Sequence, residues 1–267
     1  MDRDDTPERR TVARSIMLLK ALEAAREAAA IIHRHYQAQL DVRIKADGSP
    51  VTLADEQAEE AIKAVLIKAF PAHDFLGEET GRSGVDAEYL WLIDPIDGTK
   101  SFIRKYPFFS TQIALMRNAQ VVLGVSCASE FGAGEVAWAE RGQGAWLDDV
   151  RLQVSEVASI SECCVSLGNQ RTLARGPRWA KLGSLVAEAN RVRGYGDFYH
   201  YHLLAAGKLD VVIETDVNVL DIAALSLIVE EAGGRFTDLE GRPVGLETSS
   251  VLATNGHLHD AILSRLR

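Results

Sequence analysis

The sequence predicts an α/β protein with two halves packed as one compact unit: an α+β half, residues 1–154, and an α/β half, residues 155–267. The first half combines Ala-rich segments that lack Gly and Pro with hairpin-like alternation. In the second half, short apolar runs alternate with helical patterns, as in layered α/β folds. With 267 residues, of which 47% are hydrophobic and 25% charged, the chain can bury a core of this size.

Two helices are expected at the start of the first half. The first covers residues 11–39, and the second runs from about Leu53 to Phe70, where Pro71 ends it. One face of the first helix carries a stripe of large apolar residues: Ile16, Leu19, Leu22, Ile31 and Ile32. Two short apolar runs stopped by acids, DFLGEE and YLWLID, come next, and hairpins are expected at residues 111–129 and 134–148.

The second half is predicted to alternate strands and helices. Strands are expected at residues 163–168, 190–196 and 209–214, and helices at residues 177–190, 198–207 and 221–234. A Gly pair closes the last helix.

Composition excludes several classes of protein. The net charge of −9 and the lack of a long basic run argue against nonspecific binding of nucleic acid or anionic membranes. The N-terminus is charged and has no apolar signal core, and no apolar stretch approaches the ~18 residues of a spanning helix. The cysteines, Cys127, Cys163 and Cys164, have neither the number nor the spacing of a disulfide framework or a zinc site. We therefore expect buried thiols and a reducing, cytoplasmic setting.

Acidic residues gather where strands end and helices begin. Glu78 and Glu79 follow DFLG, Asp94 and Asp97 follow YLWLI, and Asp221 opens a helix. Hard cations bind such groups of carboxylates, and Mg²⁺ prefers a few carboxylates together with water and substrate phosphate. A cation between Asp94 and Asp97 would explain why two acids that repel each other stand so close in the chain.

The residues that follow Asp94 fit the same site. Pro95 stiffens the turn and lacks an N–H, so the Ile96 carbonyl could face inward as another oxygen ligand. Gly98 and Thr99 would begin a helix or turn whose free N–H groups could hold a phosphate.

Each acid also has a purely structural explanation. Asp94 and Asp97 could cap a helix, and Asp221 could be an N-cap. Asp55 fits a capping box that starts at Thr52. Glu78 and Glu79 could form a solvated turn. Taken singly, each acid is better explained in this way, but their joint placement beside a Gly-Thr turn favours a metal site.

Three motifs in order resemble the inositol monophosphatase superfamily of Mg²⁺-dependent, lithium-sensitive phosphatases: GEE at 77–79, DPIDGTKSF at 94–102 and LDIAALSLIVEEAGG at 220–234. The resemblance covers nearly the whole chain from about Ala13. It departs at Leu220, where many members carry Trp. The resemblance implies a layered αβαβα sandwich and a homodimer.

Metal ligands follow from the resemblance, residue by residue. Glu78, Asp94 and the Ile96 carbonyl resemble the ligands of a first metal ion. Asp94, Asp97 and Asp221 resemble those of a second ion, and Glu78 also borders a third site. The resemblance thus implies two or three Mg²⁺ ions.

The same resemblance implies roles around the substrate. Asp55 and Thr99 match an acid–threonine pair that, with Glu78, orients or deprotonates the attacking water. The N–H groups of Gly98 and Thr99 would hold the phosphate, with Asp97 and Asp221 beside the substrate. Because the water attacks directly, no covalent phosphoenzyme is needed, and Cys127 is expected in the core.

The segment around Asp197 indicates a substrate. GYGDF, followed by an aromatic-rich helix, looks like the histidinol-phosphatase branch of the superfamily. Histidinol phosphate carries an ammonium and an imidazole, which Asp197 and Glu214 could bind. The alternatives remain that Asp197 is the N-cap of the helix and that Glu214 contacts inositol hydroxyls.

The sequence leads to a first hypothesis of a cytoplasmic, Mg²⁺-dependent phosphomonoesterase acting on L-histidinol phosphate. An inositol-1-monophosphatase or a broader sugar- and nucleotide-phosphate phosphatase is the alternative, and a non-catalytic regulator that binds phosphorylated ligands is a third. Lys45 could approach the site or be a surface residue. Three His pairs are interpreted as packing or surface residues rather than a transition-metal site: His33 and His35, His200 and His202, His257 and His259.

Overall fold

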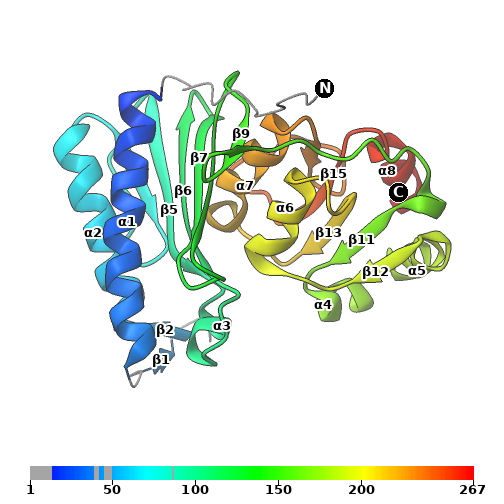
Figure 1. The fold of residues 1–267 in the computed structure, drawn as a ribbon, viewed down its shortest axis with the longest axis horizontal. Helices are drawn as coiled ribbons and strands as arrows, with labels where there is room; N and C mark the ends of the chain where they lie inside the picture. The colour runs from blue at the N-terminus through cyan, green and yellow to red at the C-terminus, as the bar shows by residue number, and fades with distance from the viewer. Residues whose placement is uncertain (1–13, 39–41, 45–49, 86) are drawn as a thin grey trace, which may run out of the picture.

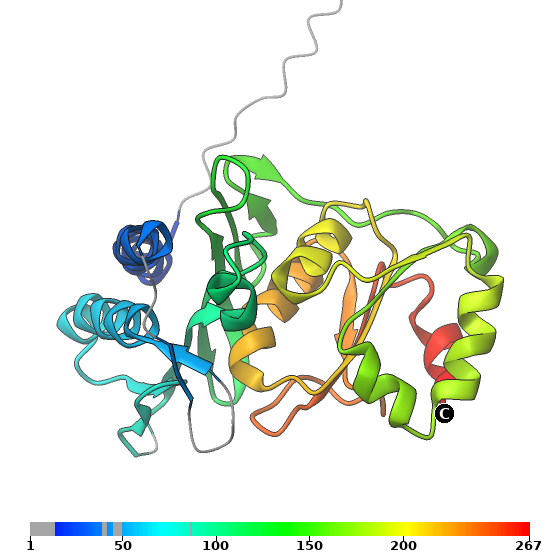
Figure 2. The ribbon, with the colours of Figure 1, turned by 90° about the horizontal axis from the view of Figure 1, so that it is seen from below.

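Helices and sheets alternate in layers across the protein, in the order helix, sheet, helix, sheet, helix (Figures 1 and 2). The structure is a computed structural model that describes residues 14–38, 42–44, 50–85 and 87–267. The predicted α/β layered sandwich is confirmed. In the part of the chain so described, no helix is both long and apolar enough to cross a lipid bilayer.

The first layer consists of helices α1 (Ile16–Gln37) and α2 (Leu53–Ala69), which pack against each other and against the larger sheet. The predicted apolar stripe on α1 is wrong at two positions, because Ile16 is 60% exposed and Leu19 46% exposed. Small side chains dominate the face that is buried instead, and they let the two helices approach closely. The buried residues of α1 are Leu18, Ala21, Leu22, Ala24, Ala25, Ala28 and Ile32.

The strands of the larger sheet are β3 (Asp74–Gly77), β4 (Gly81–Ser83), β5 (Tyr89–Asp97), β6 (Ser110–Arg117), β7 (Gln120–Ala128), β8 (Glu135–Glu140), β9 (Ala145–Leu147) and β10 (Val150–Arg151). They lie in the order β10-β9-β8-β7-β6-β5-β3-β4. The predicted hairpins are confirmed as the antiparallel pairs β6–β7 and β8–β9. Two short strands, β1 (Val42–Ile44) and β2 (Pro50–Thr52), pair separately, and α3 (Thr99–Ile103) follows β5.

The middle layer holds α6 (Asp197–Ala205) and α7 (Val219–Glu231). Helix α7 is apolar on all sides because it packs against strands β5 to β8 on one side and against α6 and β14 (Arg235–Thr237) on others. It thus brings a helix from the second half of the chain onto the sheet of the first half (Figure 1).

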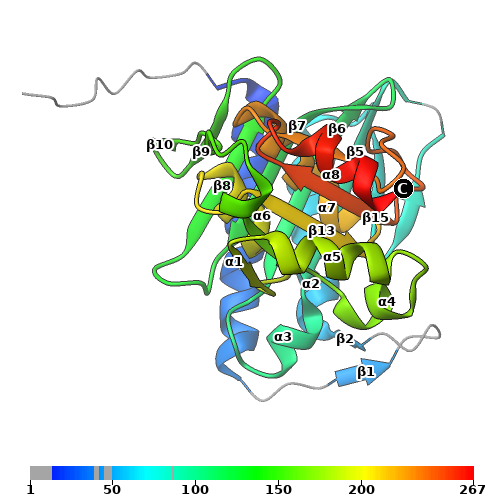
Figure 3. The ribbon, with the colours of Figure 1, turned by 90° about the vertical axis from the view of Figure 1, so that its right-hand side faces the viewer.

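The strands of the smaller sheet are β11 (Cys164–Leu167), β12 (Arg191–Arg193), β13 (Val211–Thr215), β14 (Arg235–Thr237) and β15 (Ser250–Thr254). They lie in the order β12-β11-β13-β15-β14, with β12, β11 and β13 parallel and the last two strands antiparallel to their neighbours. The last helix layer contains α4 (Gln170–Arg175), α5 (Trp179–Glu188) and α8 (His259–Leu266). Figure 3 shows α5 and α8 lying over this sheet.

The predicted division after residue 154 falls in the segment between the last strand of the larger sheet and β11, which includes the 3₁₀ helix η1 (Ile160–Glu162). Several elements were not anticipated, namely the short strands β1, β2, β4 and β10, the 3₁₀ helix η1, and the C-terminal-half elements α4, β14, β15 and α8. The last strand of the predicted series, β13, is therefore not an edge, since β15 and β14 extend the sheet beyond it.

Candidate active site

Strand β5 ends in a bulge that turns Asp94 and Asp97 to the same side. Residues three apart on a regular strand point to opposite faces. Here the pairing with β6 shifts register between Asp94 and Asp97, around Pro95, which has no N–H for a neighbouring strand. The Pro95 carbonyl accepts the Thr111 hydroxyl at 2.9 Å, and the Ile96 N–H donates to Asp94 Oδ1 at 2.9 Å.

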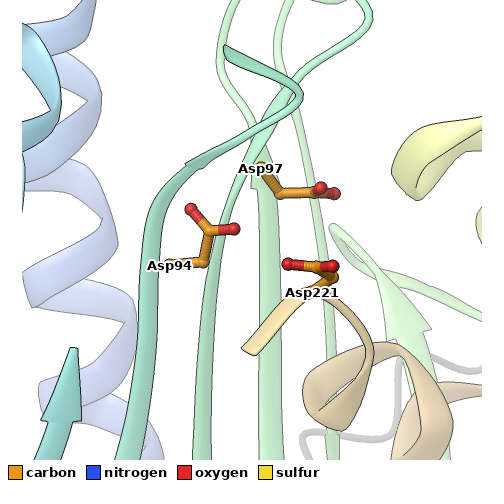
Figure 4. A group of neighbouring side chains, drawn as sticks. All are labelled: Asp94, Asp97 and Asp221. Atoms are coloured by element: carbon orange, nitrogen blue, oxygen red, sulfur yellow. The ribbon is translucent and has the colours of Figure 1, made fainter. Parts of the chain in front are cut away.

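Asp221 comes to the same place from the start of α7. Asn218 is the N-cap of this helix, and Asp221 completes a capping box by accepting the Asn218 N–H at 2.9 Å. The alternative of Asp221 as the N-cap is therefore wrong, although the acid does serve the cap from the third helical position. In Figure 4, the side chains of Asp94 and Asp97 extend from β5 toward Asp221.

The three aspartates form a compact cluster of oxygen ligands. One carboxylate oxygen from each of Asp94, Asp97 and Asp221 lies within 4.8 Å of the others. Asp94 is buried, and Asp97 and Asp221 are half-buried. This spacing allows one cation to contact all three side chains.

Burial and mutual repulsion make the cluster electrostatically unfavourable by itself. Burial raises the pKa of Asp94 well above its ordinary value, and the charges of Glu78, Asp97 and Asp221 raise it further. The pKa of Asp97 is also raised well above its ordinary value, first by burial and then by the charge of Asp221. Burial raises the pKa of Asp221 to about 7, against the Asn218 hydrogen bond that lowers it. A bound cation would reverse these shifts.

Glu78 lies in the turn after β3, and its N–H donates to the Ile93 carbonyl at 3.1 Å. Its carboxyl group raises the pKa of Asp94 by charge and by a hydrogen bond between the two groups. The structure thus brings Glu78 to the aspartate cluster.

The turn that carries Glu78 is held by Glu59, a fully buried acid on α2. Glu59 accepts the Glu79 N–H at 2.7 Å and the Thr80 N–H at 3.1 Å, and it also accepts the Thr80 hydroxyl. Gly77 leaves room for this carboxylate, because a Cβ there would lie 2.2 Å from Glu59 Oε1. The sequence reading missed Glu59, whose signal is an acid on the buried face of α2, four residues after Asp55.

Asp55 serves its helix and the site together. Its Oδ2 accepts both the N–H and the hydroxyl of Thr52 at 2.7 Å, so the capping-box alternative is confirmed. Its Oδ1 lies 3.5 Å from the Thr99 hydroxyl, which also lies 3.1 Å from the Ile96 carbonyl. Burial raises the pKa of Asp55. The expected pairing of Asp55 with Thr99 is present in the structure.

Gly98 forms the junction between β5 and α3. Its φ of 91° lies in the left-handed region, which side chains disfavour. A Cβ would also lie 2.7 Å from the Phe108 carbonyl oxygen. Glycine is therefore required for the chain to turn from Asp97 into Thr99.

Two further acids lie beside this cluster. Asp197 opens α6 and Glu214 lies on β13, and the charges of both act on Asp97. Burial raises the pKa of Asp197 to about 6, with a further rise from the Glu214 charge. The N-cap of α6 is Gly196, so the alternative of Asp197 as the N-cap is wrong.

The remaining sequence expectations concern thiols, histidines and Lys45. Cys127 is buried and its pKa is raised to about 12, mainly by burial, which fits a core residue rather than a nucleophile. No His belongs to a potential metal-binding group among the residues that the structure describes. His200, however, is not mere packing, since its Nε2 lies 3.1 Å from Glu214 Oε2. Lys45 lies outside the described residues.

Similarity to known proteins agrees with this arrangement. The sequence model of the inositol monophosphatase family matches residues 15–267. The histidinol-phosphatase of Mycobacterium tuberculosis is 40% identical over 234 residues, 85% of this chain and 89% of that protein. The inositol-1-monophosphatase of Mesorhizobium japonicum is 35% identical over 263 residues, 96% of this chain and 98% of that protein.

The fold is also similar to that of a solved structure. The crystal structure of the extragenic suppressor protein suhB from Bartonella henselae has a TM-score of 0.87 and 32% identity, covering 95% of this chain and 99% of that one. The family match extends over both halves and includes all the acids described above. The chain belongs to the inositol monophosphatase family and is a phosphoric monoester hydrolase.

Proposed function

We propose that the chain is a Mg²⁺-dependent phosphatase that hydrolyses L-histidinol phosphate to L-histidinol and phosphate. The names of relatives in the histidinol-phosphatase group support this substrate. The observation that carries the proposal is the pair of acids, Asp197 and Glu214, beside the aspartate cluster. Following the sequence-based expectation, the proposal includes a cytoplasmic location and a homodimer.

The donor set fits Mg²⁺. One carboxylate oxygen from each of Asp94, Asp97 and Asp221 lies within 4.8 Å of the others, and burial together with the charges of neighbouring acids raises the pKa values of all three. We assign Glu78, Asp94, the Ile96 carbonyl, Asp97 and Asp221 as the residues that would hold the ions. When bound, Mg²⁺ would offset the phosphate charge and make a coordinated water more acidic.

Side chains of the protein orient the attacking water. Thr99 Oγ1 accepts a hydrogen bond from the water, while its own proton is held by Asp55 Oδ1 or the Ile96 carbonyl. Glu78 accepts the proton that the water releases. The N–H groups of Gly98 and Thr99, where the chain turns out of β5, hold the phosphate oxygens.

Glu59 should act on this site through the turn that it holds. We expect Glu59→Gln to lower kcat and Mg²⁺ affinity by roughly 10- to 100-fold, the usual effect of removing a group that supports a ligand. Both oxygens of Glu59 accept hydrogen bonds from the Glu79–Thr80 turn, and the amide can replace only one of them. Calorimetric Mg²⁺ titration together with kinetics would measure both effects.

Glu60→Gln is the matched control, because Glu60 is the next residue on α2 and is exposed. Equal Mg²⁺ affinity in the two variants would refute a role for Glu59 in positioning Glu78.

Substrate preference comes from Asp197 and Glu214 in this proposal. L-Histidinol phosphate has an ammonium and an imidazole on its alcohol part, and the two carboxylates offer opposite charge and hydrogen-bond acceptors. Inositol-1-phosphate is the second candidate, favoured by a relative of that name. Its hydroxyl groups would donate to the same carboxylates.

Phosphate release decides between these substrates. L-Histidinol phosphate and inositol-1-phosphate are compared side by side, with Mg²⁺ and with EDTA. A Mg²⁺-dependent preference for L-histidinol phosphate is the expected result, and a preference for inositol-1-phosphate would overturn the substrate assignment. Binding of either ester without hydrolysis would point to a regulator instead.

Asp197→Asn separates charge recognition from helix packing. We expect it to raise KM for L-histidinol phosphate by about 10- to 100-fold, because hydrogen bonds to charged groups are worth about 1.5–3 kcal/mol. KM for inositol-1-phosphate should rise far less, since its hydroxyl groups are neutral. Initial-rate kinetics on both esters provide the comparison, and equal increases would contradict a charge-reading role.

A further inference from the structure

Glu214 is held from one side by two consecutive residues of α6. Its Oε2 accepts the Tyr201 hydroxyl at 2.8 Å and lies 3.1 Å from His200 Nε2. Glu214 is only 6% exposed, and His200 and Tyr201 are fully or almost fully buried. Two donors on one oxygen leave the carboxylate little freedom to rotate.

Gly168 limits Glu214 from the other side. A Cβ at Gly168 would lie 2.0 Å from Glu214 Oε1, so an alanine and the present carboxylate cannot both occupy this space. The backbone at Gly168 is not left-handed, and its N–H donates to the Ile213 carbonyl at 3.0 Å, next to Glu214. Glycine is therefore needed here for space rather than for conformation.

The same hydrogen bonds extend to the segment before Asp197. Because Glu214 is an acceptor, His200 carries its proton on Nε2, and Nδ1 accepts the Ser166 hydroxyl at 3.3 Å. Ser166 Oγ in turn accepts the Tyr195 N–H at 3.2 Å, two residues before Asp197. Hydrogen bonds thus run from Glu214 through His200 and Ser166 to the backbone of the half-buried Tyr195, two residues before Asp197.

We infer that Ser166, Gly168, His200 and Tyr201 are positioning residues for substrate specificity: this Glu214 network fixes the Glu214 carboxylate relative to Asp197. The inference rests on the proposed function in one respect, that Glu214 contacts the alcohol part of the ester. None of the four residues of the network is among the proposed metal ligands. The network therefore acts on the choice of alcohol and not on the transfer of the phosphoryl group to water.

Gly168→Ala tests the network directly. We expect kcat/KM for the preferred ester to fall by roughly 10- to 100-fold, the loss of a well-placed charged hydrogen bond. Turnover of p-nitrophenyl phosphate, whose leaving group has no hydrogen-bond donor, should stay within about 2-fold, since its leaving group needs no contact with Glu214. Gly183→Ala is the control, because a Cβ at Gly183 on α5 meets nothing within 4 Å.

A double-mutant cycle shows whether Gly168 acts through Glu214. In Glu214→Ala the carboxylate is gone and the alanine methyl at position 168 has room. Gly168→Ala should then add nothing to the loss already caused by Glu214→Ala. Additive losses would mean that Gly168→Ala disturbs the fold, and would overturn the inference.

Substitutions at His200 provide a second readout that does not depend on Gly168. His200→Gln can keep a donor toward Glu214 and should retain most of the discrimination between the specific ester and p-nitrophenyl phosphate, whereas His200→Leu should lose it. His202→Leu is the control, because His202 is buried on the same helix but contacts Glu135 and Ser126. Equal discrimination in His200→Leu and His202→Leu would refute the assignment.

The outcomes separate the inference from the proposed function. A wild-type preference for inositol-1-phosphate overturns the histidinol assignment. The Glu214 network is then still tested by the activity of each variant on inositol-1-phosphate relative to its activity on p-nitrophenyl phosphate. A wild-type protein that hydrolyses p-nitrophenyl phosphate as well as either specific ester overturns both. A preference for L-histidinol phosphate that survives in Gly168→Ala overturns the network alone.

Discussion

Asp94→Asn and Asp221→Asn are each expected to reduce kcat by at least about 10³-fold. Groups that only support a metal ligand cost about 10- to 100-fold when removed, and a ligand in the cluster should cost more. Both side chains lie in the group whose oxygens converge within 4.8 Å. An amide has one acceptor oxygen and no charge, so the variant loses the attraction that would hold the cation.

Kinetics with saturating Mg²⁺ and calorimetric Mg²⁺ titration give the two measurements for these variants. Asp260→Asn is the control, because Asp260 is 83% exposed on α8 and pairs only with Arg235 among the ion pairs of the described residues. Circular dichroism should show a folded protein in all three cases. Mg²⁺-dependent turnover retained in both active-site variants would exclude the cluster as the metal site.

The acids of the site could be predicted from the sequence because residue type and order carry the information. Asp94, Asp97 and Asp221 stand in segments whose local patterns end a strand or begin a helix. The structural and functional explanations of these acids proved compatible rather than exclusive. Asp55 and Asp221 both complete capping boxes at the third helical position while their carboxyl groups face the site.

The geometry that joins the acids could not be predicted. The bulge at Pro95 brings Asp94 and Asp97 to one side, but a sequence shows only that a proline interrupts a strand. Gly168 provides room for a side chain from another strand, Glu214. Contacts of this kind form between segments that are far apart in the sequence, so local periodicity cannot predict them.

For the fold too, local sequence patterns predicted single elements but not their packing partners. Strands predicted from apolar runs with clear turns were found, whereas β15 joins the smaller sheet between β13 and β14 through antiparallel pairing. On α1, large residues were expected to be buried, yet most of the buried residues are alanines and Ile16 is exposed. The packing partner decides which of two apolar faces is buried, and the partner is not visible in the helix itself.

In the metal-free protein, Asp221→Asn should raise stability, although the same substitution lowers activity. The folded pKa of Asp221, about 7, lies above the ordinary value of 3.8. For an acid with a raised pKa, the stability contribution is present below the unfolded pKa and is lost as pH rises through the folded pKa. In EDTA, the wild type should therefore lose stability between about pH 4 and pH 7 relative to the variant, which has no charge to bury.

Melting temperatures of both proteins at pH 5 and pH 8 measure this difference. Comparing them cancels other groups, such as His259, whose pKa is lowered to about 4 by burial and which acts in the opposite sense. We expect the advantage of Asp221→Asn to be larger at pH 8 than at pH 5 by about 2 kcal/mol, or roughly 4–8 °C. Mg²⁺ should raise the wild-type melting temperature at pH 8 and leave that of the variant nearly unchanged.

A wild type that is as stable as Asp221→Asn at pH 8 in EDTA would contradict this electrostatic description. It would mean that the capping box alone sets the stability contribution of Asp221. The hydrogen bond from the Asn218 N–H lowers the pKa of Asp221 and so favours its charged form. The opposite result, a variant that is more stable but inactive, has a direct physical meaning. The carboxylates at the end of β5 and the start of α7 then cost the fold stability that a bound cation restores, so their placement is explained by catalysis and not by folding.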